Sequence, residues 1–211
     1  MSRISVKDKE ALTAEVRAFG GQCAVSLLRR DGWNRFTMEN LASEMGVAKG
    51  TIYNYFKDKG DVVSCIIQCR ARLMADEITL MADREPDTCK LLRQLVEKYL
   101  RGNAEFRFLH TAVFEVVHKN SVSEEQALCR LKQLLKPLRE IFTALEPIFS
   151  RGMEEGVLRR MDVSRAPSLF HAMLSGVGMC GTFDSLLDAV DPAACASVAE
   201  ALLRGFVKEE K

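Results

Sequence analysis

Several features that mark common protein classes are scarce in this sequence. Only 5 of its 211 residues are proline and 7% are aromatic, a composition that favours helices. No run of about 18 uncharged apolar residues is present, so we expect no membrane span. The first residues contain no apolar stretch of the kind that a secretory signal carries, and we expect a cytoplasmic protein.

The side chains on which enzymes most often depend are also few. Three histidines provide little material for acid–base chemistry. His110 and His118 are not spaced to share one tight helix face with Glu115, so they do not suggest a metal site. Residues 176–181 spell G-x-G-x-x-G, but no strand precedes them, as a nucleotide-binding loop requires. We therefore expect no enzymatic activity, no cofactor and no metal.

The seven cysteines do not form a recognisable framework. Their number is odd and no two are spaced C-x-x-C, which argues against structural disulfides and zinc knuckles. Most are expected to be small buried apolar residues. Cys65 and Cys69 are four residues apart and share a helix face, which leaves open a thiol- or metal-responsive sensor.

The net charge of +1 is unevenly distributed. Residues 1–60 contain ten Lys or Arg against seven Asp or Glu, whereas residues 61–211 contain twenty against twenty-two. The N-terminal part is therefore the better candidate to face an anionic partner.

Helical periodicity extends along the chain. Apolar residues recur at steps of three and four from Leu12 to Leu27, which predicts a helix that ends near Gly32. Gly20 and Gly21 interrupt it, so we expect a bend or a late start there. Further helical segments follow, and Asp58 is expected to cap the first of them. A long helical region that Pro137 can kink is expected over about residues 124–155. The last two helices are expected at about residues 164–187 and 193–207. The sequence predicts an all-α protein of about nine helices.

Two short helices are predicted around a glycine turn. Thr37 is an N-cap residue whose hydroxyl accepts from the Asn40 amide, and a helix follows through Glu44. Gly46 allows a tight turn because glycine adopts positive φ at little cost. A second helix is expected over residues 48–55. This is the pattern of a helix-turn-helix.

The second of these helices has many donor groups that packing does not need. Tyrosine hydroxyls donate to phosphate oxygens, lysine supplies a point charge, and Gly50 allows close approach of the backbone. The donor side chains belong to Lys49, Thr51, Tyr53, Asn54 and Tyr55. They indicate binding to nucleic acid.

The same segment carries a family resemblance. The stretches FTMENLA (36–42) and MGVAKGTIYNYF (45–56), followed by Lys59, resemble the N-terminal domain of tetracycline-repressor (TetR) family regulators. The resemblance is strong over about residues 10–70, and RGMEEGVL (151–158) resembles the end of the family's long central helix. It implies a homeodomain-like three-helix DNA-binding domain over residues 1–60. It also implies a larger helical domain for ligand binding and dimerisation over residues 61–211.

The resemblance assigns roles by position. Lys49, Gly50 and Thr51 are expected at base edges, while Tyr53, Tyr55 and Lys59 are expected at phosphates. Met38 stands where a small or hydroxylated residue is more usual. The DNA-binding residues implied are Thr37, Met38, Lys49, Gly50, Thr51, Tyr53, Asn54, Tyr55 and Lys59.

For the remaining helices the resemblance implies a homodimer formed by the last two and an effector pocket among the others. The protein is then expected to be a repressor that binds near-palindromic double-stranded DNA until a small molecule releases it. The alternative is the same fold responding to thiol chemistry or metal through Cys65 and Cys69. The candidate pocket residues are Phe106, His110, Phe114, Phe142, Phe149, Phe170, His171 and Met173.

Overall fold

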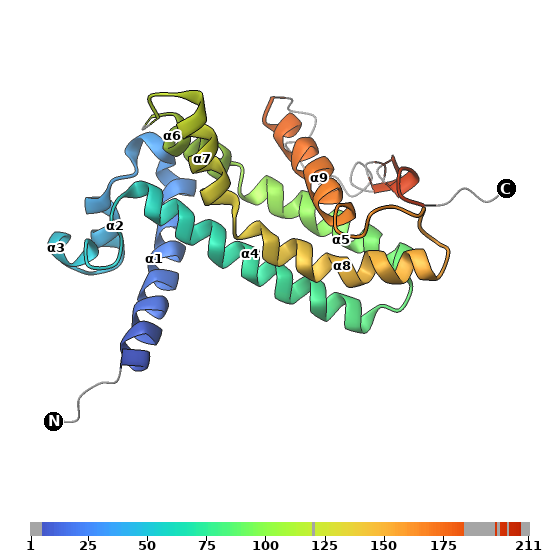
Figure 1. Cartoon of the computed structure of the whole chain (residues 1–211). Coiled ribbons are helices and arrows are strands. Elements are labelled where there is room, and N and C mark those ends of the chain that lie inside the picture. The colour runs from blue at the N-terminus through green and yellow to red at the C-terminus, as the bar shows by residue number, and fades with distance from the viewer. Residues whose placement is uncertain (1–5, 120, 184–196, 198, 202, 208–211) are drawn as a thin grey trace. The chain divides into compact units, whose positions relative to one another are not determined.

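The structure, a computed structural model, describes residues 6–119, 121–183, 197, 199–201 and 203–207 (Figure 1). Within them the chain is helical, and the β pairing is confined to an isolated bridge between Leu158 and Val207. The predicted all-α fold is confirmed. The helices are α1 (Val6–Arg35), α2 (Met38–Glu44), α3 (Lys49–Ile52), α4 (Lys59–Arg84), α5 (Thr88–Glu105), α6 (Phe108–His118), α7 (Glu124–Leu135), α8 (Leu138–Glu154) and α9 (Ala166–Phe183).

The chain divides into two compact units. The first comprises Met1–Arg70 and Phe108–Pro137, and the second comprises Ala71–Arg107 and Leu138–Lys211. Helices α6 and α7 therefore group with the N-terminal helices, and α1 contacts α6 directly. The division by function, with DNA binding in residues 1–60 and ligand binding and dimerisation in residues 61–211, stays a prediction. Among the described residues, no helix is both long and apolar enough to cross a membrane.

Helix α1 passes through Gly20 and Gly21 with helical backbone angles, so the expected bend or late start is wrong. Gly20 is instead a point of close approach, because a Cβ there would lie 2.6 Å from Cε2 of Phe56. The helix departs from helical geometry only at Gly32, whose φ is 73°. This agrees with the predicted stop.

The turn between α2 and α3 forms as its local chemistry predicts. The Thr37 hydroxyl accepts from the Asn40 amide at 3.0 Å, and Gly46 has a φ of 69°. The Val47 amide donates to the Ala42 carbonyl at 2.9 Å. Buried apolar residues hold both helices in the first unit, namely Leu41, Ala42, Ile52 and Phe56.

Helix α3 is shorter than the predicted 48–55, because the hydrogen bonding tightens after Ile52. The amides of Asn54 and Tyr55 donate to the carbonyls of Thr51 and Ile52, which are three residues earlier rather than four. Residues 53–55 form turns that continue the path of α3. Asp58 then caps α4, since its Oδ1 accepts from the Asp61 amide at 2.9 Å.

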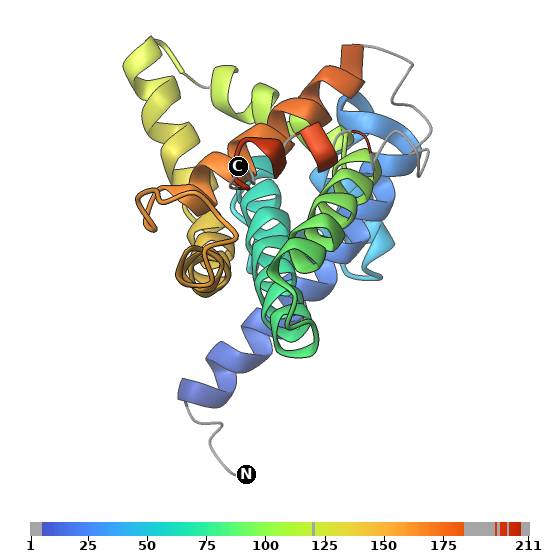
Figure 2. The same cartoon turned by 90° about the vertical axis from the view of Figure 1, so that its right-hand side faces the viewer.

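In the second unit α9 packs on both α5 and α8 (Figure 2). Its core contains a set of aromatic rings in edge-to-face contact, centred on Phe149 and Phe170, whose centroids are 5.6 Å apart. The helical region expected over 124–155 is broken at Pro137, which lacks an amide hydrogen. Gly156, with a φ of 74°, follows the end of α8. Within the predicted helix at 193–207 the structure describes residues 197, 199–201 and 203–207, of which 197, 199–201 and 203–204 are helical. Its other residues, and residues 184–187 of the helix before it, lie outside the described residues.

Candidate nucleic-acid interface

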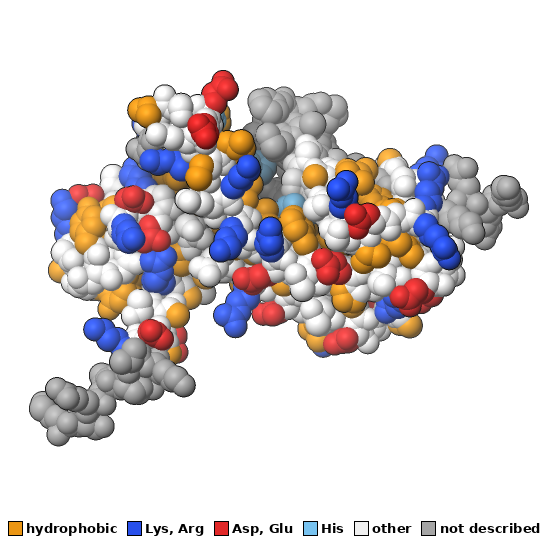
Figure 3. All heavy atoms as spheres, in the orientation of Figure 1, with side chains coloured by type: hydrophobic (Ala, Val, Ile, Leu, Met, Phe, Trp, Pro, Cys, Tyr) orange, Lys and Arg blue, Asp and Glu red, His pale blue; other side chains and the backbone are white. Residues whose placement is uncertain are grey.

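The surface of α3 and its following turn presents polar groups to solvent. The side chains of Lys49, Tyr53 and Asn54 are exposed, as is Gly50, while Thr51 and Tyr55 are half-buried. A Cβ at Gly50 would meet no atom within 4 Å, so the backbone there is open to a partner. We call Lys49, Gly50, Thr51, Tyr53 and Asn54 the α3 surface. On the face in Figure 3, basic and acidic side chains are interspersed.

Two of the predicted DNA-binding residues lie at the start of α2. Thr37 is half-buried and its hydroxyl caps the helix. Met38 is only 6% exposed and packs in the core. Its side chain is therefore not part of the surface, which corrects the expectation from its position. An apolar residue fits here because this position of α2 faces inward.

Lys49 is joined to a residue that sequence reasoning missed. Its ammonium lies 2.5 Å from the carboxylate of Glu39, an ion pair that bridges α2 and α3. The hydrogen bond with Lys49 lowers the pKa of Glu39, and the same bond raises the pKa of Lys49. Both side chains are at least half exposed. The candidate base-reading lysine is thus held by a neighbouring carboxylate. The sequence alone did not reveal this pair, because Glu39 and Lys49 meet only once the Gly46 turn brings α2 and α3 together.

Lys59 begins α4 beside two aromatic rings. Its ammonium lies 5.3 Å from the centroid of the Trp33 ring and 5.9 Å from that of Phe36. These rings stack with centroids 6.0 Å apart. Such cation–π contacts restrict a flexible lysine. The ammonium is therefore held beside these two rings, close to the end of the helix-turn-helix.

Arg17 of α1 fixes the chain that follows α3. Its guanidinium donates to both carboxylate oxygens of Asp61, at 2.7 and 3.1 Å, and to the Tyr55 carbonyl. It also lies 4.8 Å from the centroid of the Phe56 ring. The hydrogen bond from Arg17 lowers the pKa of Asp61. This group, the Arg17 clamp, holds the backbone of Tyr55 in position.

The predicted effector-pocket residues fall in both units. Six of them belong to the second unit, where His171 contacts Phe142 at a centroid distance of 5.5 Å. His110 and Phe114 belong to the first unit, and Phe114 is 60% exposed. Tyr99, which was not among the predicted residues, lies against His171 with ring centroids 5.6 Å apart. Its helical spacing marks it only as a core residue.

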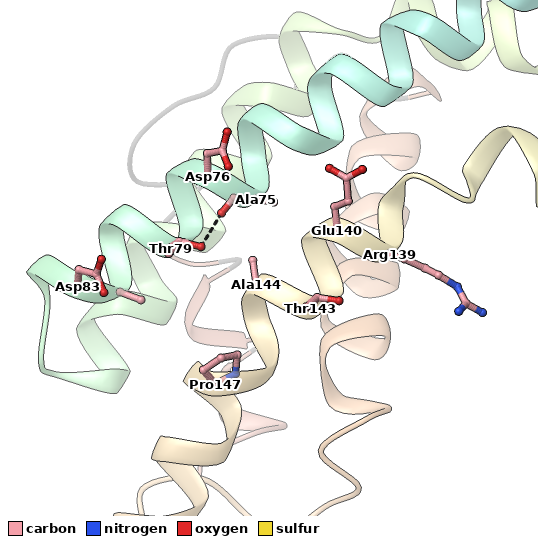
Figure 4. A pocket seen from close by; sticks show the side chains of 10 residues that line it. Ala75, Asp76, Thr79, Asp83, Arg139, Glu140, Thr143, Ala144 and Pro147 are labelled. Carbon is pink, nitrogen blue, oxygen red and sulfur yellow. Dashed lines mark hydrogen bonds between the residues drawn. The ribbon is translucent and has the colours of Figure 1, made fainter. Parts of the chain in front are cut away.

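A separate groove lies between α4 and α8 in the second unit (Figure 4), with a volume of about 630 Å³. Ala75 and Ala82 line it from α4, and Ala144 lines it from α8. Figure 4 shows Arg139 extending away from the groove. None of the predicted pocket residues lines it. Among the described residues, no group of three or more His, Cys, Asp or Glu is arranged to hold a metal ion.

The position of Cys65 does not suit a reactive thiol. Cys65 is 4% exposed, and burial raises the pKa of its thiol to about 11. Its Sγ donates to the Arg17 carbonyl at 3.3 Å. Because the thiolate is the reactive form, this thiol is kept unreactive at neutral pH.

We expect alkylation to distinguish the cysteines in the folded protein. Cys129 is exposed, so brief iodoacetamide treatment should label it, whereas Cys65 should be labelled only after denaturation. Mass spectrometry of the peptides measures both. Rapid labelling of Cys65 in the folded protein would revive the sensor interpretation.

Comparison with known proteins extends the resemblance. Residues 22–64, which include α2, α3 and the start of α4, match the family of bacterial regulatory proteins named tetR. Over 158 residues the chain is 25% identical to the nucleoid occlusion factor SlmA of Shewanella pealeana, covering 74% of this chain and 77% of that protein.

Solved structures share the fold over nearly the whole chain. A TetR-family transcriptional regulator from Pectobacterium atrosepticum aligns with a TM-score of 0.71 at 17% identity, covering 95% of this chain and 98% of the other. A complex of SmeT with triclosan aligns with a TM-score of 0.64 at 21% identity, covering 92% and 93%.

Proposed function

Because this chain belongs to the TetR family of bacterial regulatory proteins, we propose that it is a dimeric repressor released from its operator by a small molecule. The observation that carries the proposal is the α3 surface, a polar ridge held on buried apolar residues at a glycine turn. The family and fold are those of transcriptional regulators rather than enzymes.

The proposed docking places α3 in the major groove. Lys49, Gly50 and Thr51 then face base edges, where side-chain donors read sequence. Tyr53, Tyr55 and Lys59 bind phosphates, which fixes position without reading sequence. Thr37 adds a phosphate contact at the start of α2, and Asn54 lies between the two sets.

The ion pair of Glu39 with Lys49 has a consequence for this docking. A carboxylate 2.5 Å from the base-reading lysine reduces the net charge that the α3 surface offers to phosphates. Attraction to phosphates supplies most of non-specific DNA binding. Glu39 should therefore lower affinity for unrelated DNA and leave Lys49 to respond to the correct base.

Dimerisation is supported by an exposed face of α9. Leu169, Ala172 and Gly176 are exposed at steps of three and four, so they lie along one side of the helix. A second copy is the proposed partner of this face. Two α3 helices would then read half-sites about 34–36 Å apart, or a multiple of that distance, on a near-palindrome.

Release requires an effector that binds one arrangement of the dimer more tightly than the other. The proposed site is the aromatic core of the second unit, which contains Phe142, Phe149, Phe170 and His171. The structural similarity to SmeT, which was solved in complex with triclosan, supports a small-molecule effector.

Variants of the interface lysines test this proposal. Lys49→Ala is expected to weaken binding to the preferred duplex by about 10- to 100-fold and to relax one base preference. Lys59→Ala is expected to weaken binding to all duplexes similarly and to make the slope of log affinity against log salt shallower by about one. Fluorescence anisotropy at several salt concentrations measures both.

The control is Glu39→Gln/Lys49→Ala, because Lys49→Ala alone leaves an unpaired carboxylate beside the DNA. If base reading by Lys49 matters, the double variant should regain affinity for unrelated DNA but not discrimination. Unchanged affinity and discrimination in all these variants would contradict the docking.

A further inference from the structure

Two buried polar groups of the second unit have no hydrogen-bond partner among the described residues. One is the hydroxyl of Tyr99 on α5, a residue only 3% exposed, and the other is Nδ1 of His171 on α9. The second ring nitrogen of His171, Nε2, lies 3.3 Å from the hydroxyl of Ser175. Most buried polar groups in proteins are paired, so each such exception requires an explanation.

These two groups belong to one aromatic cluster. The Tyr99 ring meets the rings of His171 and Phe170 edge to face, at centroid distances of 5.6 and 6.2 Å. Phe142 of α8 meets His171 at 5.5 Å. Three helices thus contribute rings around a polar pair, an arrangement typical of ligand sites that are mostly apolar with few orienting polar groups.

The surroundings keep both groups uncharged. Burial lowers the pKa of His171 and raises the pKa of Tyr99, so at neutral pH the imidazole is neutral and the phenol is protonated. The buried members of the core cluster around them are otherwise apolar side chains. A charged ligand group entering here would lose its hydration without an opposite charge to replace it.

We propose that Tyr99 and His171 are the hydrogen-bonding anchors of the effector site, and that the effector is a neutral, largely apolar molecule with one hydroxyl group. This rests on the proposed effector site and gives the chemical class of its ligand. With Nε2 donating to Ser175, Nδ1 of His171 accepts from the ligand hydroxyl, whose oxygen accepts from Tyr99. One hydroxyl satisfies both groups.

Helix α9 connects the proposed effector site to the proposed dimer face. His171 and Phe170 belong to α9, whose other side exposes Leu169 and Ala172. A ligand that enters between α5, α8 and α9 displaces rings that pack α9 in place. Ligand binding and dimer pairing therefore both depend on the position of α9.

Four related probes test the ligand class, namely naphthol, naphthalene, naphthoate and naphthylmethylammonium. By calorimetry, naphthol is expected to bind about tenfold more tightly than naphthalene, the gain of a hydrogen bond at a buried site. The two charged probes should bind more weakly than naphthol. Tyr99→Phe should remove most of the preference for naphthol. A wild type that does not prefer naphthol, or that binds a charged probe best, would overturn the proposal.

Stability provides an independent check of the same variant. Because the Tyr99 hydroxyl has no hydrogen-bond partner among the described residues, Tyr99→Phe should unfold at the same or a higher urea concentration than the wild type. A clearly lower midpoint would mean that the hydroxyl already has a partner, and the proposal fails. If naphthol selectivity holds while DNA is not bound or not released, the proposed function fails and the ligand assignment stands.

Discussion

The Gly20→Ala variant is expected to melt at a lower temperature than the wild type, whereas Gly21→Ala should melt at a higher one. A Cβ at Gly20 would lie 2.6 and 2.9 Å from ring atoms of Phe56 and 3.1 Å from Sδ of Met45. Phe56 is fully buried and cannot move aside freely. Overpacking of this kind costs about 1–3 kcal/mol, which exceeds the gain of up to about 1 kcal/mol from replacing a helical glycine by alanine.

Gly21 is the matched control because it lies in the same helix with more room. Its added Cβ would meet Sγ of Cys65 at 3.8 Å and Cγ1 of Ile66 at 4.0 Å, which are ordinary contacts. Calorimetry should show a fall of roughly 5 °C for Gly20→Ala and a rise of roughly 3 °C for Gly21→Ala. Equal shifts for the two variants would contradict the close approach of α1 to Phe56.

Removal of the Arg17 clamp should also lower the stability of the folded protein strongly. Arg17→Met breaks a bidentate pair with Asp61 and removes the donor to the Tyr55 carbonyl. Arg17 and Asp61 are each about a quarter exposed, so solvent weakens the pair only partly. Hydrogen bonds to charged groups contribute about 1.5–3 kcal/mol, and we expect a loss of about 2 kcal/mol in the free energy of unfolding.

The contribution of Asp61 also has a defined pH dependence. Its pKa is lowered in the folded state, so the folded state binds fewer protons than the unfolded state at acidic pH. The stabilisation is therefore complete above the unfolded pKa of about 4 and is lost as the pH falls through the lowered pKa. The stability difference between wild type and Asp61→Asn should shrink between about pH 5 and pH 2.

Urea titrations of Arg17→Met, Asp61→Asn and the double variant measure the coupling. Arg204→Met serves as a control, because solvent screens the exposed pair of Arg204 with Glu200 and its removal should hardly change the free energy of unfolding. Additive losses for Arg17 and Asp61, or a wild-type advantage that persists below about pH 2, would contradict the clamp.

The features that sequence predicted correctly are those decided by neighbouring residues. The Thr37 cap, the positive φ of Gly46 and the Asp58 cap each depend on atoms within four positions along the chain. Local chemistry was therefore enough to predict the caps and the glycine turn of the helix-turn-helix, but not the length of α3 or the burial of Met38.

What sequence missed depends on which helices meet. Gly20 looked like a helix defect because nothing nearby in sequence shows that Phe56 packs against it. Tyr99 was not among the predicted pocket residues, because its hydroxyl is seen to lack a partner among the described residues only once the ring of His171 lies beside it. Spacing assigns a residue to a face of its own helix, but the residue's partners come from the tertiary packing.

Selection of bound duplexes from a random DNA library by the 211-residue protein tests the central claim most directly. The salt concentration must be fixed, because affinity for DNA depends steeply on it. We predict enrichment of a near-palindrome whose half-sites are centred about one helical turn apart, or a multiple of that distance. A folded dimer that enriches no sequence, in the absence of any ligand, would contradict the assignment of the α3 surface as a sequence-reading interface.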